Sequence, residues 1–140
     1  MPRTRRCCNV QMPPRVKGFL PMGFYASEIS DPVILHLDEF ESIRLLDKEH
    51  MNQADAALLM NVSRPTLTRI YERARQKIAQ ALTEARQILI EGGNTMFVGE
   101  WYCCSKCCSN FNITVHQKTI ICPLCSNTDV VKLNNSNQEI

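Results

Sequence analysis

Four of the eight cysteines in this 140-residue chain form two CxxC pairs, Cys104-Ser-Lys-Cys107 and Cys122-Pro-Leu-Cys125, with fourteen residues between the pairs. A CxxC pair forms a tight turn that directs two sulfurs toward one point. Two such turns supply the four thiolates that a tetrahedral zinc ion takes. Because protein ligands would fill all four positions, the expected site is structural and leaves no place for a reacting water. The sequence therefore predicts Zn²⁺ bound by Cys104, Cys107, Cys122 and Cys125.

Other interpretations of the thiols remain open. Iron also binds four thiolates, and unliganded thiols or an exchangeable, redox-sensing dithiol would need no metal. Cys103 and Cys108 adjoin the first pair, so either is an alternative ligand. Cys7 and Cys8 are expected to be free thiols, with redox sensing or a further metal site as the alternative.

A second group of residues has the chemistry of nucleic-acid binding. Residues 52–75 read NQADAALLMNVSRPTLTRIYERAR. Asn52 and Ser63 are suited to cap two successive helices, and Asn61 tolerates the left-handed turn between them. Pro65 falls in the first turn of the second helix, which is expected to run from about residue 64 to about residue 85. This order of signals is typical of a helix-turn-helix, whose second helix enters the DNA major groove.

The second helix has a cationic, hydroxyl-bearing face if the apolar positions Leu67, Ile70, Tyr71 and Ala74 point inward. Arginine pairs bidentately with guanine, and threonine contacts phosphates or the thymine methyl group. Side chains near the helix N-terminus should contact bases, and later ones the DNA backbone. The predicted contacts are Ser63, Arg64, Thr66, Thr68, Arg69, Arg73 and Arg75, with Arg3, Arg5 and Arg6 as a basic arm on phosphates or in a minor groove. The alternatives are a solvated helix face and a solubilising tail.

Charge and composition narrow the function classes. Residues 1–30 carry five cations and one acid, residues 31–61 two cations and seven acids, and residues 62–91 six cations and three acids. An aromatic content of 6% argues against a single-strand binder that stacks on bases. No phosphate loop, nucleophile elbow or HExxH occurs, so no enzyme is expected. The absence of a membrane-length apolar run or signal-peptide core predicts a cytoplasmic, nucleoid-associated protein without membrane partners.

The elements that would position these residues divide the chain into two units. Residues 31–91 are expected to form a mainly α helix-turn-helix domain of three helices, the first over 39–48 with Asp38 and Glu41 as its capping box. Residues 92–94 would be a linker, and residues 95–133 a small β domain with strands near 95–98, 113–115, 119–121 and 130–133. Residues 1–30 are expected to be an irregular basic arm, and residues 134–140 a disordered tail. Two runs, 33–37 and 87–90, fit either a strand or a helix end.

Residues 1–93 resemble a family of small prokaryotic proteins known as domain of unknown function 134, predicted to bind DNA. The matching stretches are Met1-Pro-Arg, LDEFESIRLLD at 37–47, QADAALLMNVSRPT at 53–66 and IEGG at 90–93. The helical pair also resembles region 4 of bacterial sigma-70 factors, and the cysteine unit resembles zinc ribbons. These resemblances imply a helix-turn-helix that regulates transcription. His50 and Asn61 stand where the family usually has glycine, and Ala54 where it usually has an acid.

The leading hypothesis is a transcriptional regulator that binds double-stranded DNA and carries a structural zinc site. Because one helix-turn-helix binds a half-site weakly, a homodimer is the expected arrangement on two half-sites. One alternative is a redox sensor based on thiols or metal, which a tightly held, stoichiometric zinc would contradict. The other is an adaptor that packs on a protein such as RNA polymerase, which predicts no duplex affinity above nonspecific levels.

Overall fold

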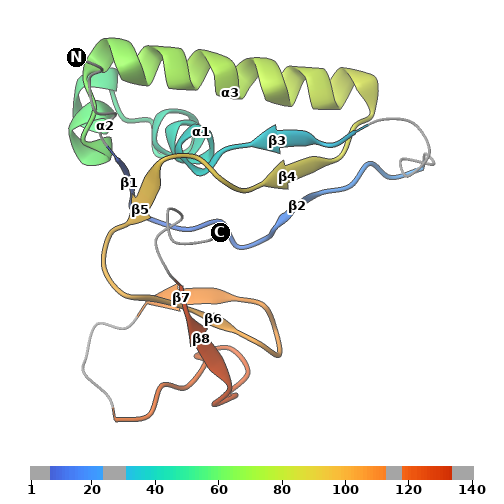
Figure 1. Ribbon diagram of the computed structural model, residues 1–140, viewed down its shortest axis with the longest axis vertical. Helices are drawn as coiled ribbons and strands as arrows, with labels where there is room; N and C mark the ends of the chain where they lie inside the picture. The colour runs from blue at the N-terminus through green and yellow to red at the C-terminus, as the bar shows by residue number, and fades with distance from the viewer. Residues whose placement is uncertain (1–6, 24–30, 113–117, 134–140) are drawn as a thin grey trace.

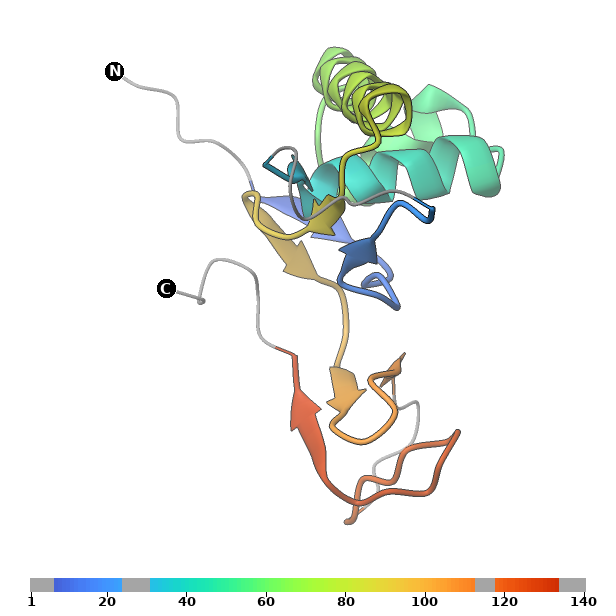
Figure 2. The same ribbon diagram turned by 90° about the vertical axis from the view of Figure 1, so that its right-hand side faces the viewer.

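The computed structural model describes residues 7–23, 31–112 and 118–133. These residues form three α-helices, one π-helical turn and eight short strands in three small sheets. Figure 1 shows the helices at one end of the molecule and the sheet of residues 101–132 at the other. The two regions are also separate in Figure 2, where the molecule is turned by 90°. No helix among the described residues combines the length and apolar character needed to cross a bilayer.

The described residues contain three α-helices, and the second and third of them follow the predicted capping signals. The helices are α1 (Leu37–Ile43), continued by the π-helical turn η2 (Arg44–Lys48), then α2 (Gln53–Met60) and α3 (Arg64–Glu84). The Asn52 side chain accepts a hydrogen bond from the Asp55 amide at 2.8 Å, and the Ser63 hydroxyl accepts one from the Thr66 amide at 3.3 Å. Asn61 is left-handed with a φ of 57°. The predicted caps and the turn between α2 and α3 are therefore confirmed.

The start of α1 differs from the prediction. Helix 39–48 was expected to begin after Asp38, but α1 begins at Leu37 with His36 as its N-cap. The Glu39 carboxylate accepts a hydrogen bond from the His36 amide at 2.8 Å, which satisfies one of the unpaired donors at the helix start. Glu39 is only 1% exposed, so its burial against α3 sets where the helix begins.

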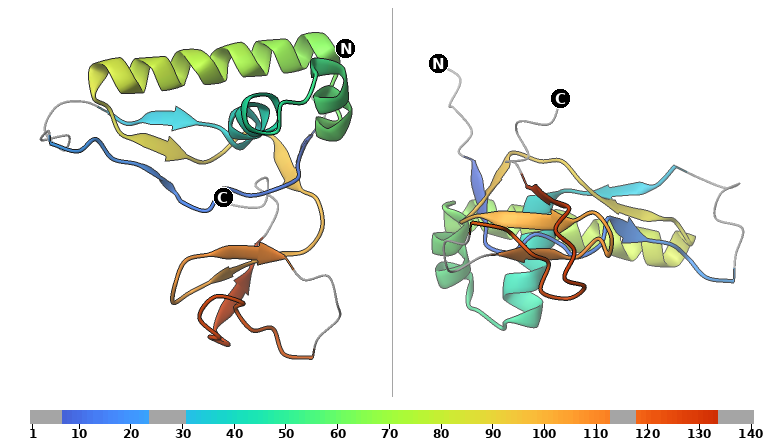
Figure 3. Two further views of the ribbon diagram at one scale, coloured as in Figure 1. Left: turned by 180° about the vertical axis from the view of Figure 1, so that it is seen from behind. Right: turned by 90° about the horizontal axis from the view of Figure 1, so that it is seen from below.

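Two small sheets lie beside the helices. The strands β1 (Cys8–Val10) and β5 (Thr95–Phe97) pair in parallel. In the second sheet, β4 (Ile88–Ile90) lies between β2 (Gly18–Phe19), which is antiparallel to it, and β3 (Val33–Leu35), which is parallel. Figure 3 shows α3 running along the side of β3 and β4, with which it shares an apolar core.

The expectation of a mainly α N-terminal domain is therefore wrong, because five strands in two sheets accompany the helices. Residues 1–30, expected to be irregular, supply β1 and β2. Strands of two or three residues show no alternating pattern, and their partners lie far along the chain, so local periodicity does not reveal them. Arg3, Arg5, Arg6 and the tail 134–140 lie outside the described residues.

Two apolar clusters fix α3. One contains Val10, Leu35, Leu37, Ala74 and Ile90, and the other contains Leu45, Ala56, Ala57, Met60 and Leu67. Three of the four α3 residues predicted to point inward do so, since Leu67, Ile70 and Ala74 are at most 3% exposed. The fourth, Tyr71, is only partly buried. The second cluster joins α2 to the start of α3, and the first joins the middle of α3 to the strands. The opposite face of α3 is left at the surface.

The cysteine region has its own antiparallel sheet. Its central strand, β6 (Trp101–Cys104), lies between β7 (Asn110–Asn112) and β8 (Val130–Lys132). Only β8 matches a predicted strand of this sheet, because β6 and β7 were not expected, 119–121 is not a strand and 113–115 lies outside the described residues. The run 95–98, expected to start this region, instead supplies β5, which pairs with β1.

Candidate metal centre and nucleic-acid interface

The four predicted cysteines lie together. The Sγ atoms of Cys104, Cys107, Cys122 and Cys125 are all within 4.8 Å of one another. The Cys104–Cys125 pair of sulfurs is 3.5 Å apart and the Cys107–Cys122 pair 3.6 Å. A disulfide would hold sulfurs about 2.05 Å apart, whereas zinc with bonds of about 2.3 Å to four sulfurs sets them about 3.8 Å apart. The geometry is therefore compatible with a four-thiolate metal site.

The two CxxC turns have the same backbone geometry. In each, the amide four residues after the first cysteine donates to that cysteine's carbonyl at 2.9 Å, from Cys108 to Cys104 and from Ser126 to Cys122. Cys108 and Ser126 are both left-handed, with φ values of 60° and 61°. Non-glycine residues adopt this conformation at a cost, so each turn accepts local strain in order to direct two sulfurs inward.

Hydrogen bonds favour thiolates at the centre of this cluster. The Ser109 hydroxyl, followed by backbone amides, lowers the pKa of Cys122 to about 6. The Cys107 amide likewise lowers the pKa of Cys104, with help from the Asn127 side chain at 3.6 Å. The Asn127 amide lowers the pKa of Cys125, but burial and hydrogen bonds with the neighbouring thiols outweigh it and raise this pKa to about 12. Four thiolates this close repel one another, so a cation would be needed to ionise all four.

The neighbouring cysteines stand apart from this cluster. Among the described residues, neither Cys103 nor Cys108 belongs to a group of metal-ligating side chains. Cys103 contacts the Cys104 carbonyl oxygen at 3.7 Å, and Cys108 is exposed. The set that comes together is thus the one with two-residue spacing at both turns. Elsewhere, burial and then the charge of Asp38 raise the pKa of Cys8 to about 11, which makes this a packed, protonated thiol.

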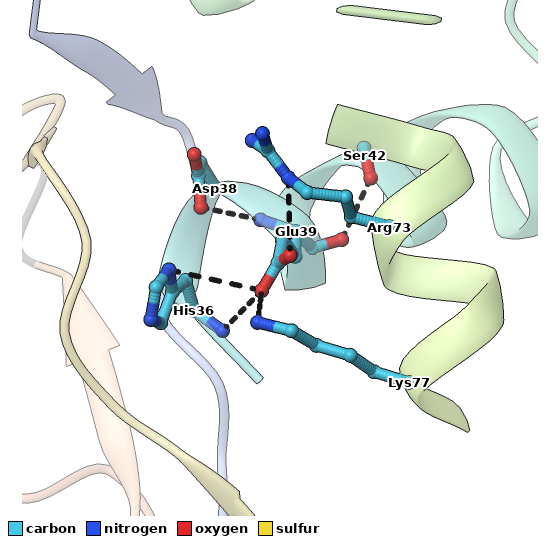
Figure 4. Close-up of polar contacts among 6 residues, drawn as sticks. All are labelled: His36, Asp38, Glu39, Ser42, Arg73 and Lys77. Atoms are coloured by element: carbon cyan, nitrogen blue, oxygen red, sulfur yellow. Dashed lines mark hydrogen bonds and ion pairs between the residues drawn. The ribbon is translucent and has the colours of Figure 1, made fainter. Parts of the chain in front are cut away.

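A second cluster of ligand-type side chains occurs at the start of α1 (Figure 4). Donor atoms of His36, Asp38 and Glu39 lie within 4.8 Å of one another. Two cations from α3 already face this cluster. Lys77 Nζ is 2.6 Å from Glu39 Oε1, and Arg73 Nε is 3.7 Å from Glu39 Oε2. The cluster is therefore part of an ion-pair network that joins α1 to α3 through Glu39.

Burial also affects Asp38 in this network. It raises the pKa of the Asp38 carboxyl, against the opposing effect of the Glu39 amide, which donates to Asp38 Oδ1 at 2.8 Å. Sequence reasoning missed this network because Asp38 and Glu41 were assigned to a helix cap, and Glu39 was counted only in the charge excess of residues 31–61. Glu39 pairs with Lys77, which lies 38 residues further along the chain, so no local sequence pattern predicts this contact.

The residues at the start of α3 form a connected polar surface. The Ser63 hydroxyl donates to Thr66 Oγ1 at 2.8 Å. Arg64 Nε and Thr68 Oγ1 lie 3.4 Å and 3.2 Å from the side-chain oxygen of Gln53 on α2. Four of the predicted contact residues therefore lie together, and Gln53, which was not predicted, connects two of them.

The predicted arginines divide into two groups. Among the described residues, Arg64 and Arg69 form no ion pair, and both are exposed. Arg73 is paired with Glu39, and the Arg75 guanidinium lies 5.3 Å from the ring centre of Tyr71, within cation–π range. The Tyr71 hydroxyl in turn donates to Asp47 at 2.8 Å. Of the three α3 arginines without an ion pair among the described residues, Arg64 and Arg69 lie in the first two turns and Arg75 lies further along, against the Tyr71 ring.

The comparisons place the N-terminal region in a known family. The family model described as "Protein of unknown function DUF134" matches residues 1–97. A protein of Caldicellulosiruptor saccharolyticus named "UPF0251 protein" is 41% identical over 130 residues, which cover 93% of this chain and 88% of the relative. A protein of Pelotomaculum thermopropionicum with the same name is 39% identical over 129 residues, covering 92% and 96% respectively.

These relatives cover both the helices and the cysteine region, since their matches extend over more than nine-tenths of the chain. No solved structure matches this chain. The family match over residues 1–97 and the identity with the two relatives agree. The chain therefore belongs to the DUF134 family, whose members include the UPF0251 proteins.

Proposed function

We propose that this protein binds double-stranded DNA and regulates transcription, with α2 and α3 acting as a helix-turn-helix similar to sigma-70 region 4. In this arrangement the start of α3 enters the major groove, and the preceding helix and turn set its angle. The four-cysteine cluster holds a structural zinc ion. Its thiolates fill a tetrahedral site, so the metal would stabilise the fold and would not activate water.

The observation that carries the DNA proposal is the distribution of neutralised and unneutralised arginine along α3. Arg73 and Lys77 share the buried Glu39 carboxylate, whereas Arg64 and Arg69, in the first two turns, pair with no carboxylate among the described residues. Arg75 also has no ion pair there, but its guanidinium lies over the Tyr71 ring. The N-terminus of a helix also presents unpaired amides and a partial positive charge. Cationic side chains that remain available at that end suit a polyanion with base edges that accept hydrogen bonds.

The direct test is selection of bound sequences from a random duplex library, followed by affinity measurements on the selected duplex. We expect a dissociation constant between about 10⁻⁸ and 10⁻¹¹ M at physiological salt. This constant should rise steeply, and the affinity should fall, as the salt concentration increases. Arg64→Ala or Arg69→Ala should weaken binding to the selected duplex by about 5- to 150-fold, the value of a bidentate base contact.

The matched control is Lys132→Ala, which removes a cation from β8 whose only described ion pair is with Glu100. This change should leave the affinity within about twofold, because one exposed cation outside the groove contributes little. Selection of no sequence, or equal affinities for wild type and both arginine variants, would show that α3 does not contact bases.

A separate measurement tests zinc. Metal analysis of the purified protein should find one zinc per chain, lost when Cys107 or Cys122 becomes serine. If the analysis finds one iron per chain, the four-cysteine site stands and its metal is iron instead of zinc. A chain with no bound metal and readily oxidised CxxC pairs would support the redox-sensor alternative instead.

A further inference from the structure

If α3 reads bases as proposed above, we infer that Gln53, the first residue of α2, is a positioning residue that sets its base preference. Its side-chain oxygen contacts two side chains of α3, Arg64 and Thr68, across the turn between the helices. Gln53 would thereby hold the base-contacting side chains in one orientation before DNA arrives.

The geometry accounts for both contacts. An amide oxygen has two lone pairs, and Gln53 Oε1 lies 3.4 Å from Arg64 Nε and 3.2 Å from Thr68 Oγ1. The Thr68 hydroxyl also lies 3.1 Å from the Arg64 carbonyl oxygen, so its single proton is shared between a backbone acceptor and Gln53. The helices that carry these groups are fixed by Ala57, Met60 and Leu67, which are at most 4% exposed.

The contact orients Arg64 without occupying the donors that recognition needs. A guanidinium group has five N–H donors, and Gln53 engages the one on Nε. The two terminal nitrogens, which provide the fork for a guanine edge, remain available. Because an arginine side chain has about 2 kcal/mol of rotamer entropy to lose, partial ordering in the free protein lowers the cost of ordering it on DNA.

The hydrogen-bond acceptor for Arg64, the Gln53 amide oxygen, is neutral, and this affects how much positive charge Arg64 offers to DNA. Arg73 faces the Glu39 carboxylate, whose single charge it shares with Lys77. Gln53 is uncharged, so Arg64 keeps its full charge for DNA. The acid in the first turn of α2, Asp55, accepts a hydrogen bond at its Oδ2 from the Asn52 side-chain nitrogen at 3.0 Å and forms no described ion pair with Arg64. The start of α2 therefore holds the Arg64 side chain and does not neutralise it.

The test is a double-mutant cycle on the full-length protein, read as the ratio of affinities for the selected duplex and an unrelated one. Gln53→Ala should reduce this ratio by about 3- to 10-fold and leave binding to the unrelated duplex unchanged. In an Arg64→Ala, Thr68→Val background, the same change should have no further effect, because Gln53 acts through those two side chains. Gln53→Met, which keeps the length of the side chain and lacks the acceptor, should behave as Gln53→Ala does.

The matched variant is Gln53→Glu, which keeps an acceptor and adds a charge. It should retain the affinity ratio while weakening both duplexes, because the added carboxylate repels phosphate. This inference would be overturned if Gln53→Ala and Gln53→Met left the affinity ratio unchanged. It would also be overturned if the effect of Gln53→Ala were fully additive with the loss of Arg64 and Thr68. In either case the proposal that Arg64 contacts bases would still stand. Failure of the wild-type protein to select any duplex would overturn the proposed function, and the inference with it.

Discussion

The helical region and the cysteine region of this chain are held together in different ways. The helical region contains two apolar clusters, formed by residues far apart in sequence, and its helices are capped by their own side chains. The core of the cysteine region consists of Tyr102, Cys104, Phe111 and Cys122, so half of its buried members are thiols. A unit this small cannot bury enough apolar surface to be stable alone. The difference suggests that the second region depends on metal where the first depends on packing.

Metal removal should have the largest effect and should be confined to one region. Structural zinc contributes on the order of 10 kcal/mol or more to the folding of small domains, so a strong chelator or Cys107→Ser should unfold the cysteine region. The only tryptophan in the chain, Trp101, is 8% exposed on β6. Its fluorescence should shift to the red while the helical circular dichroism signal persists. Simultaneous loss of both signals would show that the regions unfold together.

The converse change is Leu67→Ala in the helical region. Leu67 is completely buried in the cluster that joins α2 to α3, and its truncation should lower the free energy of unfolding by about 3–5 kcal/mol. Urea denaturation followed by circular dichroism measures this loss. Metal content and Trp101 fluorescence in native buffer should match those of the wild type. Released metal at urea concentrations that unfold only the helices would contradict the separation of the regions.

The buried ion pair tests whether the helical region relies on packing alone. Lys77→Met leaves Glu39, 1% exposed, without the ammonium group 2.6 Å away, and should destabilise the region by about 3 kcal/mol. The double variant Glu39→Met, Lys77→Met should regain most of this loss, since two apolar side chains can replace a buried ion pair. If the single variant is as stable as the wild type, the remaining Arg73 contact is sufficient to neutralise Glu39.

The smallest expected effect concerns pH. Burial raises the pKa of Asp38 in the folded protein above its usual value of 3.8. The folded state then binds the proton more tightly, so stability is highest in acid and falls as pH rises from the unfolded pKa through the folded one. Asp38→Asn keeps the oxygen that accepts from the Glu39 amide. This variant should be slightly more stable near neutral pH, and its unfolding free energy, measured between about pH 3 and pH 7, should be less dependent on pH.

The sequence predicted the parts of the fold that depend on near neighbours. The caps at Asn52 and Ser63 and the turn at Asn61 each act within three or four residues, so their signals are local. The mainly α assignment was wrong because pairing of β1 with β5 joins residues at opposite ends of the family region. The start of α1 was missed for a related reason, because it depends on Glu39 and its distant partner Lys77.

In the candidate sites, too, the sequence predicted features that depend on neighbouring residues and missed contacts between residues far apart in the chain. The two-residue spacing favoured the four cysteines that lie together in the structure. It left Cys103 and Cys108 open as alternative ligands, and the structure does not bring these two into the cluster. The sequence predicted base contacts for Arg64 and Arg69 and a DNA-backbone contact for Arg73, but it did not reveal that Arg73 faces a buried acid. Gln53 was missed because its partners lie 11 and 15 residues away, across a turn. Side-chain contacts between helices need the interhelical geometry, which periodicity does not provide.

The parallel pairing of Cys8–Val10 with Thr95–Phe97 has a consequence for how the chain reaches its folded form. The two strands are about ninety residues apart, and contacts of such long range form slowly because a large loop must close first. During synthesis the first strand leaves the ribosome long before its partner exists. The first of the two strands to be made therefore waits for its partner, and a fragment that stops before Thr95 would leave that strand without its neighbour.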